Sequence, residues 1–167
     1  MENELALVYL ALANVDRAAE HATAARGTFE RLGNDRWLAH LTDTEAQIRL
    51  AAGDVDGARH LALRAVDAAR SASDVKATVT ALATLGRAER ELGALAEARR
   101  ALEEAADLAR DHGRRAQIQT VLGELATVVA ESGDLRRAFE LSQEALHAGR
   151  ATPADRRRAR QGAPSRT

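Results

Sequence analysis

The sequence contains no cysteine, which excludes disulfides, thiolate metal sites and cysteine nucleophiles. Aromatic residues are also scarce, with one Trp, one Tyr and two Phe among 167 residues. The β-branched and aromatic runs that are typical of strands are missing, whereas alanine, the best helix former, is the most frequent residue. We therefore expect an all-α protein with a core of Ala, Leu and Val side chains.

The sequence also lacks a long hydrophobic run. No segment approaches the roughly 18 unbroken apolar residues that a membrane-spanning helix requires. The first residues, Met1-Glu2-Asn3-Glu4, are acidic, whereas a signal peptide begins with basic residues. These features predict a cytoplasmic protein with no membrane partner.

What the sequence does contain is a short segment that recurs four times at an unbroken spacing of forty residues. The copies begin at Ala13, Gly53, Gly93 and Gly133 and read ANVDRA, GDVDGA, GALAEA and GDLRRA. Self-similarity at such a period is the signature of a solenoid, in which each unit buries its apolar face against its neighbours. We expect one domain over residues 1–150, with repeats at about 1–33, 34–73, 74–113 and 114–150, followed by a tail over 151–167.

The second repeat illustrates how each unit is built. Four apolar residues recur at the spacing of one helical stripe: Trp37, Leu38, Leu41 and Ile48. Gly53 is predicted to end this helix, because glycine adopts the left-handed conformation without steric cost. Asp56 is predicted to be the N-cap of the next helix, with Val55 packing as a hydrophobic staple in front of it.

The same pattern predicts a pair of helices in every repeat. The second helix of repeat two is expected to reach about residue 72, and the others to span 2–12, 75–92, 96–112, 115–132 and 136–148. The first of these is the shortest. It fits either a chain that continues upstream of Met1 in a longer protein or a natural short capping helix.

Small residues at three positions of each copy resemble the tetratricopeptide repeat (TPR). With the turn glycine counted as position fifteen of that motif, positions eight, twenty and twenty-seven are small in all four copies: Ala6, Ala46, Gly86 and Ala126; Ala18, Ala58, Ala98 and Ala138; and Ala25, Ala65, Ala105 and Ala145. Leu85-Gly86 and Tyr9 match the motif as well. The resemblance covers residues 2–149 and implies a right-handed α-α superhelix of four helix-turn-helix repeats.

The chain departs from the family in three ways. Its period exceeds the usual thirty-four residues, so each helix is expected to be about one turn longer. The family's aromatic position holds Ala22, Ala62, Leu102 and Ser142, and its helix-ending proline is replaced by Arg70, Arg110 and Arg150. Long repeats of this kind resemble those of bacterial regulators, such as MalT-like sensor domains and TPR regions linked to a helix-turn-helix domain.

The resemblance also implies where a partner binds, because the first helix of each TPR pair lines the concave wall of the superhelix. The corresponding polar positions are His40, Asp43, Gln47, Thr80, Arg87, Arg90, Thr120 and Thr127. The other positions on this wall are Asn3, Leu7, Leu10, Leu50, Ala83 and Gly123. Arg87 and Arg90 lie three residues apart on one helix face and are placed to hold a carboxylate. Alternatively, both only pair with nearby acids such as Glu91 and Glu131.

No catalytic, metal-binding or cofactor-binding pattern is present. The five histidines lack metal-ligand spacing: His21, His40, His60, His112 and His147. The segment Asp54-Val55-Asp56-Gly57 resembles a calcium loop only superficially, because its glycine comes too early. We expect a binding protein without a cofactor, and not an enzyme.

The tail is basic, with six arginines and one acid from Arg150 onward. Thr152-Pro153 is a good helix start, so one interpretation is a short helix over 153–161 that covers the last repeat, where Leu141 and Leu146 would otherwise be partly exposed. The other is a solvated, disordered tail. Without interleaved aromatic residues, it is expected to contact nucleic acid weakly at most.

Taken together, these features predict a scaffold that binds a protein or peptide in the concave groove. Two alternatives remain. One is a domain of a transcriptional regulator that senses a small-molecule effector, which an enclosed cavity would favour over an open channel. The other is a self-association module whose terminal repeats stack into a homodimer.

Overall fold

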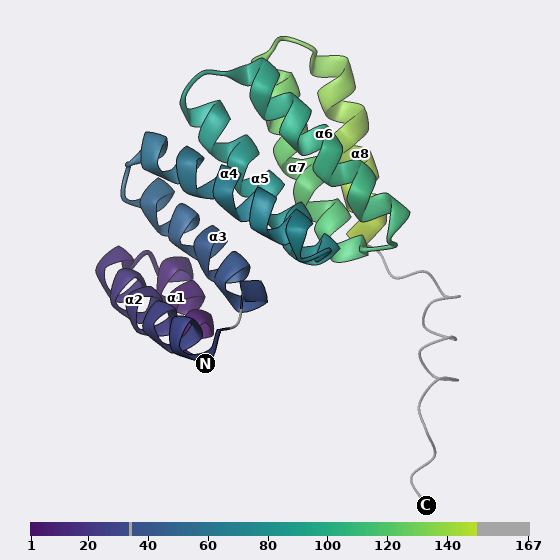
Figure 1. Cartoon of the computed structure of the whole chain (residues 1–167). Helices are drawn as coiled ribbons and strands as arrows, with labels where there is room; N and C mark the ends of the chain where they lie inside the picture. Colours follow the sequence, from purple (N-terminus) through teal and green to yellow (C-terminus); the bar gives the residue numbers. More distant parts are fainter. Residues whose placement is uncertain (34, 150–167) are drawn as a thin grey trace, which may run out of the picture.

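The computed structural model describes residues 1–33 and 35–149, and this part of the chain consists of helices without any strand (Figure 1). The helices are α1 (Glu2–Ala11), α2 (Val15–Leu32), α3 (Asp35–Ala51), α4 (Val55–Ser71), α5 (Val75–Glu91), α6 (Leu95–Asp111), α7 (Arg115–Glu131) and α8 (Leu135–Gly149). They stack in chain order as four helix pairs. The all-α array of four helix-turn-helix repeats is thus confirmed, and the predicted helix ends are correct within one residue except at the start of α4.

Every turn between described helices contains one residue in the left-handed conformation. Five are glycines: Gly33, Gly53, Gly93, Gly113 and Gly133. Ala13 and Ser73 adopt the same conformation with φ of 55° and 52°. At Gly53 the chain reverses within two residues, because Gly53 N–H donates to Leu50 O and Asp54 N–H donates to Arg49 O. The same tight turn therefore joins the two helices within a repeat and the successive repeats.

This turn corrects the predicted N-cap of α4. The cap is Asp54, whose Oδ1 accepts a hydrogen bond from Gly57 N–H at 3.0 Å, whereas Asp56 is an exposed residue of the first turn. The prediction was wrong because a single left-handed residue suffices to reverse the chain, so the helix begins immediately after Asp54. Side chains in the same register cap three other helices: Asn14, Asp74 and Asp134.

The core is built mainly from alanine, leucine and valine, as expected. Within the apolar stripe predicted for α3, Leu41 and Ile48 are buried. Trp37 was also placed on this stripe, but it is 45% exposed and stacks on Phe29 of α2, with 5.7 Å between the ring centroids. Trp37 lies in the first turn of α3, at the edge of the array, where the core does not reach.

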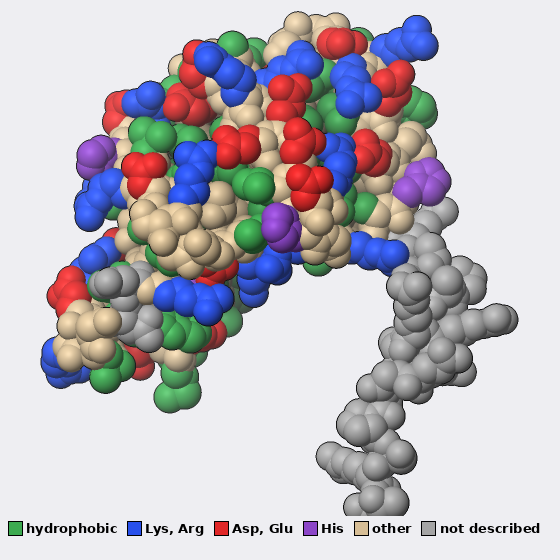
Figure 2. Space-filling view, turned by 45° about the vertical axis from the view of Figure 1, so that its right-hand side comes forward, with side chains coloured by type: hydrophobic (Ala, Val, Ile, Leu, Met, Phe, Trp, Pro, Cys, Tyr) green, Lys and Arg blue, Asp and Glu red, His purple; other side chains and the backbone are tan. Residues whose placement is uncertain are grey.

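The odd-numbered helices form the inner wall of the array. α1 packs against α3, α3 against α5 and α5 against α7, whereas no two even-numbered helices in the described part of the chain pack against each other. This closer spacing places the odd-numbered helices on the concave side. Across the wider outer gaps, Arg70 is paired with Glu104 and Arg110 with Glu144. Figure 2 shows one face on which basic and acidic side chains are interspersed.

At the C-terminal end, the two residues that the tail was predicted to cover differ in exposure. Leu146 is 54% exposed, as expected, but Leu141 is buried in the core of the last pair. The prediction for Leu141 was wrong because α7 already covers it. The proposed tail over 151–167 lies outside the described residues, as does Arg150.

Candidate binding groove

Two neighbouring cavities lie on the wall formed by the odd-numbered helices. The first has a volume of about 390 Å³ and is lined by Gln47, Val79, Thr80, Ala83, Arg87, Ala116, Gln117, Thr120, Val121 and Glu124, from α3, α5 and α7. The second has a volume of about 420 Å³ and is lined by Leu10, Gln47, Leu50, Ala51, Gly53, Val55, Arg87 and Glu91. Gln47 and Arg87 line both. We call the two cavities together the groove.

The structure places part of the predicted set in this groove. Four of the eight polar residues line the first cavity: Gln47, Thr80, Arg87 and Thr120. Of the remaining wall positions, Ala83 lines the first cavity and Leu10 and Leu50 line the second. Four of the predicted polar residues line neither cavity: His40, Asp43, Arg90 and Thr127.

Arg87 occupies the boundary between the two cavities. Its Nη2 donates a hydrogen bond to Thr84 Oγ1 at 3.2 Å, and none of the carboxylates in residues 1–33 and 35–149 lies within 4.0 Å of its guanidinium nitrogens. The side chain is only partly exposed. A partly buried guanidinium without a carboxylate partner is prepared to accept one from a ligand.

Arg90 is engaged, in contrast. Its guanidinium lies 2.8 Å from Glu91, 3.9 Å from Glu124 and 4.0 Å from Glu131. For Arg90 the structure therefore agrees with the alternative prediction, in which the arginine pairs with neighbouring acids. Of the two acids that line the groove, Glu91 is the direct partner of Arg90 and Glu124 lies 3.9 Å from it, whereas Arg87 has no carboxylate within 4.0 Å among the described residues.

Asp43 lies behind Arg87, buried in the wall. Gln47 Nε2 donates to its Oδ2 at 2.8 Å, whereas its Oδ1 has no hydrogen-bond partner. Burial raises the pKa of Asp43 against the opposing effects of the nearby Thr84 hydroxyl, the Gln47 hydrogen bond and the Arg87 charge. Burial therefore disfavours the charged form of this carboxyl relative to a solvated aspartate.

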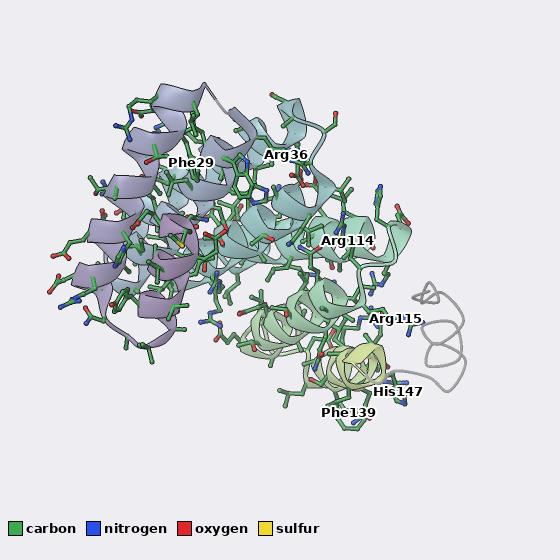
Figure 3. The ribbon with its side chains drawn as sticks, turned by 90° about the horizontal axis from the view of Figure 1, so that it is seen from below. Phe29, Arg36, Arg114, Arg115, Phe139 and His147 are labelled. Atoms are coloured by element: carbon green, nitrogen blue, oxygen red, sulfur yellow. The ribbon has the colours of Figure 1, made fainter. Side chains whose placement is uncertain are left out.

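His40 belongs to a structural cluster at the start of α5. Its Nε2 lies 3.2 Å from Oδ2 of Asp74, the buried N-cap of α5, and Arg36 Nε donates to the same oxygen at 2.8 Å. Burial alone would raise the pKa of Asp74, but the hydrogen bonds from Ala77 N–H, Arg36 and His40 lower it to about 2. Figure 3 shows Arg36 on this edge of the array, with Arg114 and Arg115 at the start of α7.

Several groove residues were not identified from the sequence: Val79, Ala116, Gln117, Val121 and Glu124. Gln117 Nε2 donates to Lys76 O and to Thr80 Oγ1, at 3.0 and 3.1 Å, which joins α7 to α5. Gln117 and Glu124 lie three residues before and four after Thr120, so they share its helix face. Extending the stripe from Thr120 along α7 would have found both.

The described residues include no group of three or more His, Cys, Asp or Glu side chains that could hold a metal ion. None of the described helices is both long enough and apolar enough to cross a membrane. The groove presents one arginine without a direct carboxylate partner among the described residues, together with amides, hydroxyls and apolar side chains, and these groups are suited to binding a ligand.

No known family model matches the chain, and no curated protein matches it either. Solved structures do. A Rap protein complexed with Competence and Sporulation Factor aligns with a TM-score of 0.82 and 17% identity, over 88% of this chain and 41% of that one. The apo form of RapI aligns with a TM-score of 0.76 and 13% identity, over 96% and 57%. BtubC from P. vanneervenii aligns with a TM-score of 0.73 and 18% identity, over 99% and 66%.

At these identities the likeness shows the fold alone. The architecture is that of a TPR-like helical solenoid. The chain spans less than two thirds of the length of each of these three proteins.

Proposed function

We propose that this chain is a binding scaffold that holds an extended peptide, or an extended segment of a protein, in the groove between α1, α3, α5 and α7. The observation that carries the proposal is Arg87, an arginine without a carboxylate partner at the boundary of two apolar cavities. An extended segment spans two adjoining cavities more readily than a compact effector does. We assign no reaction to the chain.

The similar structures support this proposal at the level of the fold. One of them is a Rap protein complexed with Competence and Sporulation Factor, so the same fold accommodates a bound factor in that protein. The long repeats favour a regulatory setting in the bacterial cytoplasm, as in MalT-like or helix-turn-helix-linked regulators. We further propose that residues 1–150 act as one repeat domain and that 151–167 are its tail.

The test begins with a random linear peptide library displayed on phage and selected against the full chain. The affinities of the selected peptides are then measured for the wild type, for Thr120→Trp and for Arg64→Gln. Thr120 is exposed and lines the first cavity, so tryptophan fills the cavity without disturbing the core. Arg64 is exposed on the outer helix α4 and is the control.

Binding in the groove predicts that Thr120→Trp weakens the selected peptides by about tenfold or more, equivalent to about 1.4 kcal/mol. Arg64→Gln should leave the affinity unchanged. If Thr120→Trp binds the peptides as tightly as the wild type while retaining its helical circular dichroism, the groove is not the binding site.

A second candidate function, self-association, rests on the end of the array. Leu135, Phe139 and Leu146 of α8 are 71%, 65% and 54% exposed, and Figure 3 shows Phe139 on the outside of this helix. The positions equivalent to Phe139 in the two preceding repeats are Arg59 and Arg99. If this face joins two copies, Phe139→Arg should convert a dimer to a monomer in light scattering. A wild-type monomer at high concentration would contradict it.

A further inference from the structure

We infer that the groove is specific for a segment in which one acidic side chain is flanked on both sides by apolar side chains. This inference rests on the proposed function, because it describes the ligand of the same groove. It predicts the order of apolar and acidic side chains along the ligand from the order of the cavities and Arg87 along the groove.

That order is apolar cavity, cation, apolar cavity. Leu10, Leu50 and Val55 contribute apolar surface to the second cavity, and the first is lined by Ala83 and Ala116 together with the buried side chains of Val79 and Val121. Only the Gln47 and Arg87 side chains line both cavities. A ligand that fills both must therefore pass these two side chains. Burying apolar side chains on either side stabilises the complex by about 25 cal/mol per Å² removed from water.

The central position requires an anion, because Arg87 is the groove cation that lacks a carboxylate among the described residues. Arg90 is already shared among Glu91, Glu124 and Glu131. Asp43 makes no direct ion pair with Arg87 within 4.0 Å, and its burial raises the pKa of its carboxyl. A neutral ligand would leave the partly buried guanidinium of Arg87 deprived of water and without a carboxylate partner, with Thr84 Oγ1 as its hydrogen-bond acceptor.

The anion is an internal side chain and not the C-terminal carboxylate of the ligand. A terminal carboxylate at Arg87 would end the chain there and leave one of the two cavities empty. With an Asp or Glu side chain, the ligand backbone continues in both directions. Gln47, beside Arg87, offers an amide that is suited to a peptide group of the passing backbone.

The experiment uses the phage-displayed random peptide library against the full chain and compares the sequences that four proteins enrich. The wild type should enrich an acidic residue with an apolar residue on each side. Arg87→Glu should enrich a basic residue at the central position. Thr120→Trp and Ala51→Trp each fill one cavity from an exposed position, so each should lose the apolar preference on one side only.

Circular dichroism and the thermal unfolding midpoint establish that each variant is folded before selection. Enriched peptides that bind the groove but show no central acidic residue, or the same central residue for wild type and Arg87→Glu, would overturn the inference and leave the proposed function intact. Peptides that are enriched equally by all four proteins would overturn both, because none of the groove changes would then matter. If a variant with one filled cavity lost the apolar preference on both sides of the central residue, the proposed order of two separate cavities would also be overturned.

Discussion

Gly86 of α5 and Leu102 of α6 are complementary in volume: a Cβ atom at Gly86 would lie 2.6 Å from Leu102 Cγ. The equivalent pairs in the other repeats are Ala6 with Ala22, Ala46 with Ala62 and Ala126 with Ser142. Where the second helix carries a large side chain, the first carries glycine, and where it carries a small one, the first carries alanine. Within each pair, the volume at the position that is aromatic in TPR motifs is therefore matched by the small residue of the first helix.

Gly86→Ala should destabilise the protein. The gain of about 1 kcal/mol from helix propensity is outweighed by overpacking against Leu102, which typically costs about 1–3 kcal/mol. Leu102→Ala alone should cost about 2–5 kcal/mol. The double variant recreates the alanine pair of the first two repeats, so its loss should be smaller than the sum. Urea unfolding of the four proteins measures this coupling.

The control for Gly86→Ala is Gly123→Ala in α7. A Cβ at Gly123 meets nothing within 4 Å, so this change should stabilise by up to about 1 kcal/mol through helix propensity alone. Equal effects of the two substitutions would show that the contact with Leu102 does not constrain Gly86.

The N-cap of α4 is tested by comparing two adjacent acids. Asp54→Ala removes the hydrogen bond to Gly57 N–H and should lower the free energy of unfolding by about 0.5–2 kcal/mol. Asp56→Ala removes only a charge near the helix N-terminus, which is worth about 0.3–1 kcal/mol. Chemical denaturation should rank Asp54→Ala as the more damaging change. The reverse order would restore Asp56 as the cap.

Asp74 should make stability depend on pH at the acidic end. Its pKa is lowered from 3.8 to about 2, so its carboxylate stabilises the fold above pH 3.8 and this contribution is lost as the pH falls toward 2. Asp74→Asn keeps an N-cap but removes the charge. It should cost about 2 kcal/mol at neutral pH and almost nothing near pH 2. A difference that persists unchanged across this range would contradict the role of the charge.

Asp43 should affect the pH dependence of stability in the direction opposite to that of Asp74. Burial raises its pKa, so the folded protein holds this proton to higher pH than the unfolded chain, and ionisation lowers stability as the pH rises above 3.8. Asp43→Asn can still accept the Gln47 hydrogen bond. It should unfold at a higher urea concentration than the wild type at neutral pH, with a smaller advantage at low pH. The exposed Asp67→Asn is the control; an equal response from both would remove burial as the cause.

The fold was predictable because its determinants are local and repeated. The forty-residue repeat, the turn glycines and the small residues at fixed positions define the helix pairs, and apart from the start of α4 the predicted ends agree within one residue. The cap of α4 was missed because the chain reverses directly after Gly53, so the helix begins two residues earlier than predicted. The exposure of Trp37 was missed because a helical stripe does not tell where along its length the core ends.

The groove was predictable only in part, because it depends on contacts between helices forty residues apart. The positions of Gln47, Thr80, Arg87 and Thr120 within the repeat motif were enough to predict that they line the groove. It did not distinguish Arg87 from Arg90, which share a helix face. Arg90 pairs most closely with its chain neighbour Glu91, and Glu124 and Glu131 of the stacked helix α7 add two longer contacts that Arg87 lacks.

The most direct test of the account is a reciprocal charge swap at Arg87. A peptide selected by the wild type is prepared with its central acidic residue and with arginine in its place, and each is titrated against the wild type and Arg87→Glu by fluorescence anisotropy. We expect each single swap to weaken binding by about tenfold or more, and the double swap to recover most of the affinity. Independent effects of the two swaps, with no recovery in the double combination, would contradict a ligand carboxylate at Arg87.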